Sequence, residues 1–189
     1  MNENHRNLCD SDRWAEYLRD EVLPWVLGDR PLGGSLLEIG PGPGRTTKLL
    51  RTRVRRVTAV ESDGTAVRTL KRQFRATNVT VVHGSGDNLP FRRGRFSSAV
   101  ALTMLHHVPT GSAQDALFAE VCRVLRPGAW FLGEDSTDDP GFRGFHRGDV
   151  CNPVDPATLA DRLRAAGFDE ADVELGDHIV RFAARRNPR

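Results

Sequence analysis

Three glycines and two carboxylates have the spacing that is typical of a nucleoside-binding site. Gly40, Gly42 and Gly44 stand at alternate positions just after Glu38. Glycine lets the backbone take positive φ values and approach a ligand closely, and the helix expected to follow offers unpaired N–H groups to an anion. Glu61, 21 residues after Gly40, is placed to accept both hydroxyls of a ribose. These residues predict a site for a nucleotide-type cofactor.

The spacing of the glycines bears on which cofactor binds. A dinucleotide-binding turn reads G-x-G-x-x-G, and its last position is small so that the helix packs closely on the strand. Arg45 occupies that position here and is bulky and charged. The spacing therefore disfavours a nucleotide-linked oxidoreductase that uses NAD, although this alternative stays open.

Strands that alternate with helices are expected to position these residues. Apolar runs at residues 36–39, 56–61, 78–83, 96–102 and 129–133 read as strands, and residues 46–53, 63–74 and 112–125 read as helices. This alternation predicts a parallel sheet with right-handed crossovers. An N-terminal helix over about residues 13–27 is expected to kink or split at Pro24. Residues 171–175 and 178–184 read as a closing antiparallel hairpin.

The order of these segments resembles that of one enzyme family. The pattern Glu38-x-Gly40-x-Gly42-x-Gly44, the carboxylate Glu61 and the segments 84–91, 96–108 and 124–133 resemble class I methyltransferases that use S-adenosylmethionine. The likeness is to their small-molecule group, which includes the ubiquinone and menaquinone methyltransferases. It implies an α/β, Rossmann-like, doubly wound seven-stranded sheet of order 3-2-1-4-5-7-6. Its last strand would be antiparallel, with helices on both faces.

The resemblance implies S-adenosylmethionine as cofactor and S-adenosylhomocysteine as product. Glu38 would offset the cofactor's positive charge, and Glu61 would hold its ribose. Relatives carry an aspartate for the adenine amino group where this chain has Ser85, and Asp87 is the nearest replacement. The complete set predicted to bind the cofactor is Glu38, Gly40, Pro41, Gly42, Gly44, Glu61, Ser62, Ser85, Gly86, Asp87 and Thr103.

Two histidines, His106 and His107, follow the fourth strand at the edge of the sheet where a cofactor would lie. An unperturbed imidazole has a pKa of ~6.5 and suits proton removal near neutral pH. We predict His106 as a catalytic base. Two alternatives stay open: the pair only packs and hydrogen-bonds its loop, or alignment of the acceptor with the methyl group suffices without a base.

Acceptor recognition is expected from segments that flank the core. An N-terminal lid would include His5 and Tyr17, and a loop over residues 136–154 would line the pocket from the other side. The residues predicted to bind the substrate are Trp14, Phe142, Phe145, His146 and Arg147, which suit an aromatic or anionic acceptor. The alternative is a mobile loop that its aromatic residues anchor.

Length and composition suit a single domain over residues 1–189. Within it we expect a helical lid at 1–34, a cofactor-binding core at 35–135, the substrate-side loop at 136–154, and a helix and hairpin at 155–189. The net charge of +2 gives no electrostatic case for a nucleic acid partner. No apolar stretch reaches the ~20 residues that span a bilayer, and no signal-peptide core follows Met1, so a cytoplasmic protein is expected.

The three cysteines, Cys9, Cys122 and Cys151, are scattered and lack C-x-x-C spacing. They predict neither a disulfide framework nor a zinc site, and no metal is expected. The function that we expect is methyl transfer to a small-molecule acceptor, in a chain that a homodimer would help to complete. A methyltransferase-like binding or sensing protein with little catalysis stays open as the alternative from another class.

Overall fold

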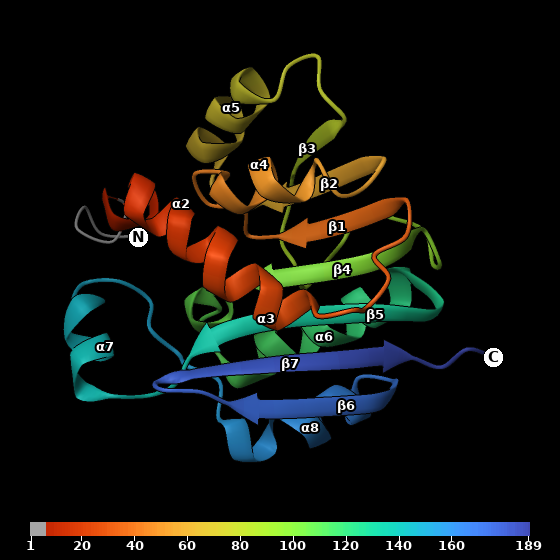
Figure 1. The fold of residues 1–189 in the computed structure, drawn as a ribbon. Helices are drawn as coiled ribbons and strands as arrows, with labels where there is room; N and C mark the ends of the chain where they lie inside the picture. The colour runs from red at the N-terminus through yellow and green to blue at the C-terminus, as the bar shows by residue number, and fades with distance from the viewer. Residues whose placement is uncertain (1–6) are drawn as a thin grey trace.

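A seven-stranded sheet forms the centre of the computed structural model, which describes residues 7–189 (Figure 1). The strand order is β3-β2-β1-β4-β5-β7-β6. Strand β7 runs antiparallel to both β5 and β6, and the other neighbouring pairs are parallel. This confirms the predicted fold. The strands are β1 (Ser35–Ile39), β2 (Arg56–Glu61), β3 (Val79–His83), β4 (Phe96–Leu102), β5 (Leu125–Ser136), β6 (Phe168–Leu175) and β7 (Ile179–Arg186).

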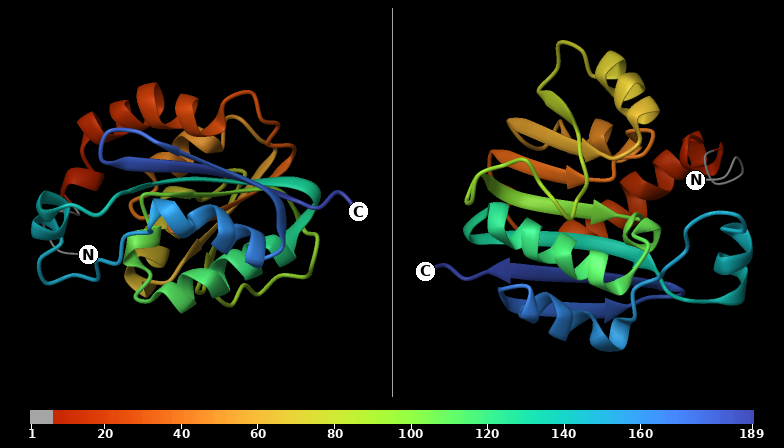
Figure 2. Two further views of the ribbon diagram at one scale, coloured as in Figure 1. Left: turned by 90° about the horizontal axis from the view of Figure 1, so that it is seen from below. Right: turned by 180° about the vertical axis from the view of Figure 1, so that it is seen from behind.

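Helices cover both faces of this sheet, as Figure 2 shows. Successive strand residues point to opposite faces. Accordingly, Leu36 packs in one apolar cluster with Leu50, while its neighbour Leu37 packs in another with Leu117. The first face carries α2 (Asp12–Tyr17), η1 (Leu18–Val22), α3 (Leu23–Leu27) and α4 (Arg45–Leu50), and the second carries α6 (Gly111–Val124) and α8 (Pro156–Ala165). Helix α5 (Gly64–Gln73) packs against β2 and β3.

The N-terminal helix is divided just before Pro24, as the sequence predicts, by a change of helix type. Proline has no N–H group and cannot continue the usual ladder of helical hydrogen bonds. The chain absorbs this by widening to a π-helical segment, η1, in which the Leu23 N–H donates to the Leu18 carbonyl five residues earlier. Pro24 then stands in the first turn of α3, where no N–H is needed. Among residues 7–189 no helix is both long and apolar enough to cross a membrane.

Two segments differ from the elements expected of them. The stretch expected to be a loop, 136–154, contains a short helix, α7 (Pro140–Phe145), which begins because Asp139 accepts from the N–H groups of Gly141 and Phe142. Strand β5 begins at Leu125, directly after α6, and passes through the Pro127-Gly128 turn. Its pairing with β4 shifts register there, between Phe96 and Ser98, so the turn is a bulge within the strand.

The site lies where the carboxyl ends of the parallel strands meet. The chain leaves β1 toward β2 and β3 and returns as β4 on the other side of β1, so β1 and β4 flank a change in strand order. In open α/β sheets, ligands bind in the crevice at that point. The glycine turn follows β1, and the histidine pair follows β4 in a short 3-10 helix, η2 (Leu105–His107).

Candidate functional site

A cavity of about 740 Å³ opens at this edge of the sheet, within the size range of small-molecule sites. The glycine turn forms one side, the end of β2 and the start of α5 form another, and residues that follow β4 form a third. The N-terminal segment completes the wall. Of the residues predicted from the sequence, the wall includes Trp14, Gly40, Pro41, Gly42, Glu61, Ser62 and Thr103.

The glycine turn needs glycine for two separate reasons. Gly40 and Gly42 have φ values of 64° and 52°, in the left-handed region that other residues avoid. A Cβ atom on Gly40 would lie 2.9 Å from the Cβ of Met104, whereas one on Gly42 would meet no atom of residues 7–189 within 4 Å. Gly40 therefore permits close packing between the β1 and β4 ends, and Gly42 presents bare backbone to the cavity.

Glu38 holds the helix after the turn and does not line the cavity. Its side chain is 2% exposed, and its two carboxylate oxygens accept from the hydroxyls of Thr46 (2.6 Å) and Thr47 (2.7 Å). Burial raises the pKa of Glu38 to about 7, against the opposing effect of the two hydroxyl groups. The Glu38 carboxylate therefore holds the first turn of α4, and its predicted contact with a cofactor stays a prediction.

Glu61 ends β2 at the cavity wall and is half-buried. One of its carboxylate oxygens accepts from the Asp63 N–H at 2.9 Å, which fixes the side chain at the start of α5. Helix α5 begins there because Asp63 caps it, accepting from the N–H groups of Thr65 and Ala66. The predicted ribose-binding carboxylate is therefore positioned by the turn that follows it.

The segment predicted to hold adenine is not brought to the cavity wall. Ser85 and Asp87 are exposed, and the Asn88 N–H donates to the Ser85 carbonyl to close a tight turn. Gly86 packs so closely beneath this turn that a Cβ atom there would lie 2.7 Å from Leu117 Cδ1 on α6. Gly44 is also absent from the wall, because it caps α4 with a φ of 82°.

Thr103 has an unusual backbone at the edge of the cavity. Its φ of 49° is left-handed, which is strained for a β-branched residue. The conformation is held by two hydrogen bonds: the Thr103 N–H donates to the Glu134 carbonyl, and its hydroxyl donates to the Leu102 carbonyl, both at 2.8 Å. The chain thereby turns sharply after β4 and places Met104 over the glycine turn.

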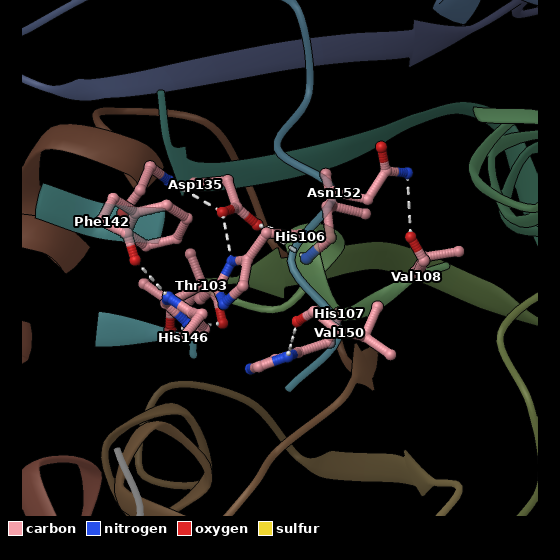
Figure 3. A network of polar contacts seen from close by, with 12 residues as sticks. Thr103, His106, His107, Val108, Asp135, Phe142, His146, Val150 and Asn152 are labelled. Carbon is pink, nitrogen blue, oxygen red and sulfur yellow. Dashed lines mark hydrogen bonds and ion pairs between the residues drawn. The ribbon is translucent and has the colours of Figure 1, made fainter. Parts of the chain in front are cut away.

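The two histidines separate into a buried ring and a ring at the wall (Figure 3). His106 is 2% exposed and its Nδ1 lies 2.5 Å from an oxygen of Asp135, a buried carboxylate that also accepts from the Leu105 N–H at 2.6 Å. His107 lines the cavity, and its Nδ1 donates to the Val150 carbonyl at 3.2 Å. Burial, followed by the neighbouring His106, lowers the pKa of His107 to about 4, so its ring is neutral at pH 7.

Of the residues expected to bind an acceptor, Trp14 lines the cavity, and the four from the segment 136–154 do not. Phe142, Phe145, His146 and Arg147 do not line the cavity, whereas Asp149 and Val150 from the same segment do. His146 is buried against His106, with ring centroids 4.8 Å apart, and Phe142 contacts His106 edge-on at 5.0 Å. The aromatic residues of 136–154 therefore pack on the histidines, and Arg147 is exposed.

The N-terminal segment is tied over the glycine turn by Arg45. Its guanidinium contacts the carboxylates of Asp10 and Asp12, both at 3.2 Å, and the backbone carbonyl of Asp10. This anchors the segment that brings Cys9, Asp10 and Trp14 to the wall. His5, the other residue expected in the lid with Tyr17, lies outside the described residues, and Tyr17 is not part of the wall.

Glu134 and Asp135 were missed by sequence reasoning, although two acidic residues at the end of an apolar strand are a usable signal. Adjacent strand residues point to opposite faces, so Asp135 reaches the histidines and Glu134 faces the N-terminal helix. Glu134 is 2% exposed, and its Oε2 has no hydrogen-bond partner within residues 7–189. Burial, then the charge of Asp135, raises the pKa of Glu134 to about 8.

Known proteins similar to this chain include enzymes with different acceptors. The chain is 30% identical over 106 residues to a fatty-acid O-methyltransferase from Mycolicibacterium smegmatis, covering 55% of this chain and 38% of that protein. It is 52% identical over 48 residues to a probable ribosomal RNA small subunit methyltransferase A from Methanopyrus kandleri, covering 25% of this chain and 17% of that protein. The chain thus spans well under half the length of either relative.

A solved structure and a family model agree on the core. The structure described as a DhpI–SAH complex superposes with a TM-score of 0.72 at 22% identity, covering 98% of this chain and 95% of that one, and it shows the fold. The family model described as a methyltransferase domain matches residues 37–133, just over half of the chain. This chain belongs to that methyltransferase domain family, whose members are class I enzymes dependent on S-adenosylmethionine.

Proposed function

We propose that this chain transfers a methyl group from S-adenosylmethionine to a small-molecule acceptor. The proposal rests on one continuous cavity, which extends from the glycine turn and Glu61 to His107 and Asp149. One end has the groups that an adenosine-bearing cofactor needs, and the other has the polar side chains of His107 and Asp149. Family membership decides against the oxidoreductase alternative.

The residues present fit the cofactor. The open face of Gly42 offers room for a ligand against bare backbone, and Glu61 offers carboxylate oxygens to hydroxyl groups at the same wall. Ser62 adds a hydroxyl beside Glu61, and Thr103 brings the end of β4 to the opposite side. When bound, S-adenosylmethionine would supply an electrophilic methyl group on a sulfonium. The chain's part is to hold the acceptor in line with it, which contributes ~7–11 kcal/mol in well-aligned reactions.

A general base remains part of the proposal. The bond from His106 Nδ1 to Asp135 orients the ring, and a base must be held in a fixed orientation. The ring of His107, with a centroid 4.1 Å from that of His106, forms the cavity wall. We propose His106 as the base. It would act at the edge of the cavity, beside the ring of His107.

The lining of the cavity supports a small-molecule acceptor. Trp14 and Leu18 from the N-terminal helix and Val150 from the substrate-side segment bound the same space, which suits a small molecule better than a polymer. The relative named as a fatty-acid O-methyltransferase supports an acceptor with an apolar body and a polar end. The cytoplasmic location, the homodimer and the absence of a nucleic acid partner stay predictions.

Calorimetric titration with S-adenosylmethionine, S-adenosylhomocysteine and NAD tests the cofactor. We expect the first two to bind and NAD not to bind. Glu61→Ala should weaken binding by about 10- to 100-fold, because hydrogen bonds to a charged group contribute about 1.5–3 kcal/mol. Asp177→Ala is the matched control, since that side chain is 99% exposed on the β6–β7 hairpin. Unchanged binding by the Glu61 variant would refute the assigned ribose contact.

An acceptor panel tests the reaction. Formation of S-adenosylhomocysteine would be followed with long-chain carboxylic acids, phenols, amines and a ribosomal RNA fragment. Turnover of one of the small molecules supports the proposal, and turnover of the RNA alone overturns the acceptor class. Tight cofactor binding with no turnover of any acceptor class would instead favour the binding or sensing protein.

A further inference from the structure

Three histidines from two distant segments converge beside the cavity (Figure 3). His106 and His107 lie in η2, and His146 ends α7, about 40 residues later. The centroid of the His146 ring lies 4.8 Å from that of His106 and 5.5 Å from that of His107. Each residue offers one ligand nitrogen, and the three nitrogens lie within 4.8 Å of one another. This convergence exists only because α7 folds back over the end of β4.

The hydrogen bonds of the three rings define which nitrogen carries the lone pair. His106 Nδ1 bonds an oxygen of Asp135 at 2.5 Å, His107 Nδ1 bonds the Val150 carbonyl at 3.2 Å, and His146 Nδ1 bonds the Phe142 carbonyl at 2.8 Å. Carbonyl and carboxylate oxygens accept, so each Nδ1 is the protonated nitrogen and each Nε2 carries the lone pair. This is the pattern of metal-binding histidines, whose second nitrogen donates to a carboxylate or a carbonyl.

We propose that His106, His107 and His146 bind a divalent transition metal ion of the zinc type through their Nε2 atoms. Three neutral imidazoles suit Zn²⁺, Cu²⁺, Ni²⁺ or Fe²⁺ and do not suit Mg²⁺ or Ca²⁺, which prefer oxygen ligands. A tetrahedral zinc with Zn–N bonds of about 2.1 Å holds two nitrogens about 3.4 Å apart. The ligand nitrogens, which lie within 4.8 Å of one another, would therefore move closer together on binding the ion.

A buried carboxylate, Asp135, holds one of the proposed ligands in place. Asp135 is completely buried and accepts from the backbone N–H groups of Leu105, His106 and Ser136 as well as from His106 Nδ1. Its negative charge would therefore stand behind one of the ligands, where it raises that ligand's affinity for a cation.

Three protein ligands leave a fourth position for water or substrate, as in catalytic zinc sites. The cluster meets the cavity at His107, beside Asp149 and Val150. If methyl transfer is the activity, as proposed above, this position selects acceptors with an oxygen or sulfur donor, such as carboxylates, phenols and thiols. A ring bound through Nε2 does not also take a proton there, so the metal site and the His106 base are competing roles.

Metal binding can be measured without methyl transfer. The chelator-treated full-length protein would be titrated with Zn²⁺ against a chromophoric indicator and with Co²⁺ by visible absorption. We expect one tight equivalent of Zn²⁺ and intense Co²⁺ bands, which indicate low coordination numbers. X-ray absorption of the zinc-loaded protein should show nitrogen ligands at about 2.0–2.1 Å. A stoichiometry near zero, or six-coordinate Co²⁺, overturns the proposal whether or not the chain methylates an acceptor.

Two variants locate the ion and one controls for the remaining histidines. His146→Gln and His107→Gln should each weaken Zn²⁺ binding at least tenfold, while His178→Asn should bind as the wild type does. His178 is 70% exposed, and asparagine tolerates its positive φ of 56°. His107 is only half-buried, so its variant should fold even if the His146 variant does not. Wild-type affinity in a folded His107 variant would show that the rings only pack against one another.

Discussion

Two regions lie at the same edge of one sheet: the glycine-turn region (residues 38–47) and the histidine region (residues 103–107, 134–135 and 146). They differ in how their buried carboxylates find hydrogen-bond partners. Glu38 accepts from threonines eight and nine residues later, on the helix that the turn begins. Asp135 accepts from Leu105 and His106, 30 and 29 residues earlier on another strand end. The first region is specified by its own sequence, and the second depends on the sheet to bring its parts together.

The largest expected effect is that of Glu134 on how the free energy of unfolding depends on pH. Glu134 is buried like Glu38, but no threonine hydroxyls are bonded to it. Its folded pKa of about 8 lies above the ordinary 4.5, so its contribution to stability is fully present below pH 4.5 and is lost as the pH rises through about 8. The loss is at most about 1.4 kcal/mol per pH unit, on the order of 5 kcal/mol in all. Glu134→Gln should remove most of this slope.

Urea unfolding of the wild type and Glu134→Gln at several pH values between 5 and 9 measures the effect. Glu38, whose pKa is raised to about 7, leaves a smaller slope of the same sign in both proteins. Glu16→Gln, at an exposed position of α2, is the control and should keep the wild-type slope. Parallel curves for the wild type and Glu134→Gln would show that the Glu134 carboxylate is stabilised in the folded protein.

Alanine variants of Gly40 and Gly42 separate the effect of backbone conformation on stability from the effect of packing. Gly40→Ala should destabilise by about 3 kcal/mol, because it combines a strained φ with contact against Met104. Gly42→Ala has the strained φ but no neighbour within 4 Å, so about 1 kcal/mol is expected. Chemical denaturation measures both values. Equal losses would mean that Met104 moves aside and that the packing of β1 against the β4 end is not rigid.

Asp135→Asn tests whether the histidine region is independent of the glycine-turn region. The amide keeps the shape but loses the charge that several N–H groups share, so a loss of about 2 kcal/mol is expected. Affinity for S-adenosylmethionine should change by less than about twofold, since Asp135 does not line the cavity. The control is Asp138→Asn, a surface ion pair with Arg143, for which at most about 0.5 kcal/mol is expected. A large fall in cofactor affinity in Asp135→Asn would show that the two regions are coupled.

Glu38→Gln should have the smallest effect and lower the free energy of unfolding by about 1 kcal/mol. The glutamine amide still accepts from one threonine hydroxyl, and the other hydroxyl can rotate to accept from its NH₂ group. Calorimetry with S-adenosylmethionine would decide between the two roles considered for this residue. A loss of affinity of about 100-fold or more at unchanged stability would support the direct charge contact predicted from the sequence over the positioning role.

The fold was predictable because its signals are local. Alternating apolar runs and turns define the strands, and the resemblance to methyltransferases supplied their order, which the structure confirms. The N-terminal helix was predicted to kink or split at Pro24, and a π-helical segment divides it just before the proline. Helix α7 was missed because the glycines and the proline of 140–145 are weak helix formers, and only the Asp139 cap favours it.

The sequence by itself determined the glycine turn, the carboxylate that ends β2 and the alternation of strands with helices, because neighbours in the chain specify them. Only the tertiary structure decided that Glu38 faces Thr46 and Thr47, that Ser85 lies away from the cavity and that His146 meets His106. The physical reason is that a strand turns each next residue to the opposite face, and loops join segments tens of residues apart. Which side chains then share one volume depends on packing across the whole sheet.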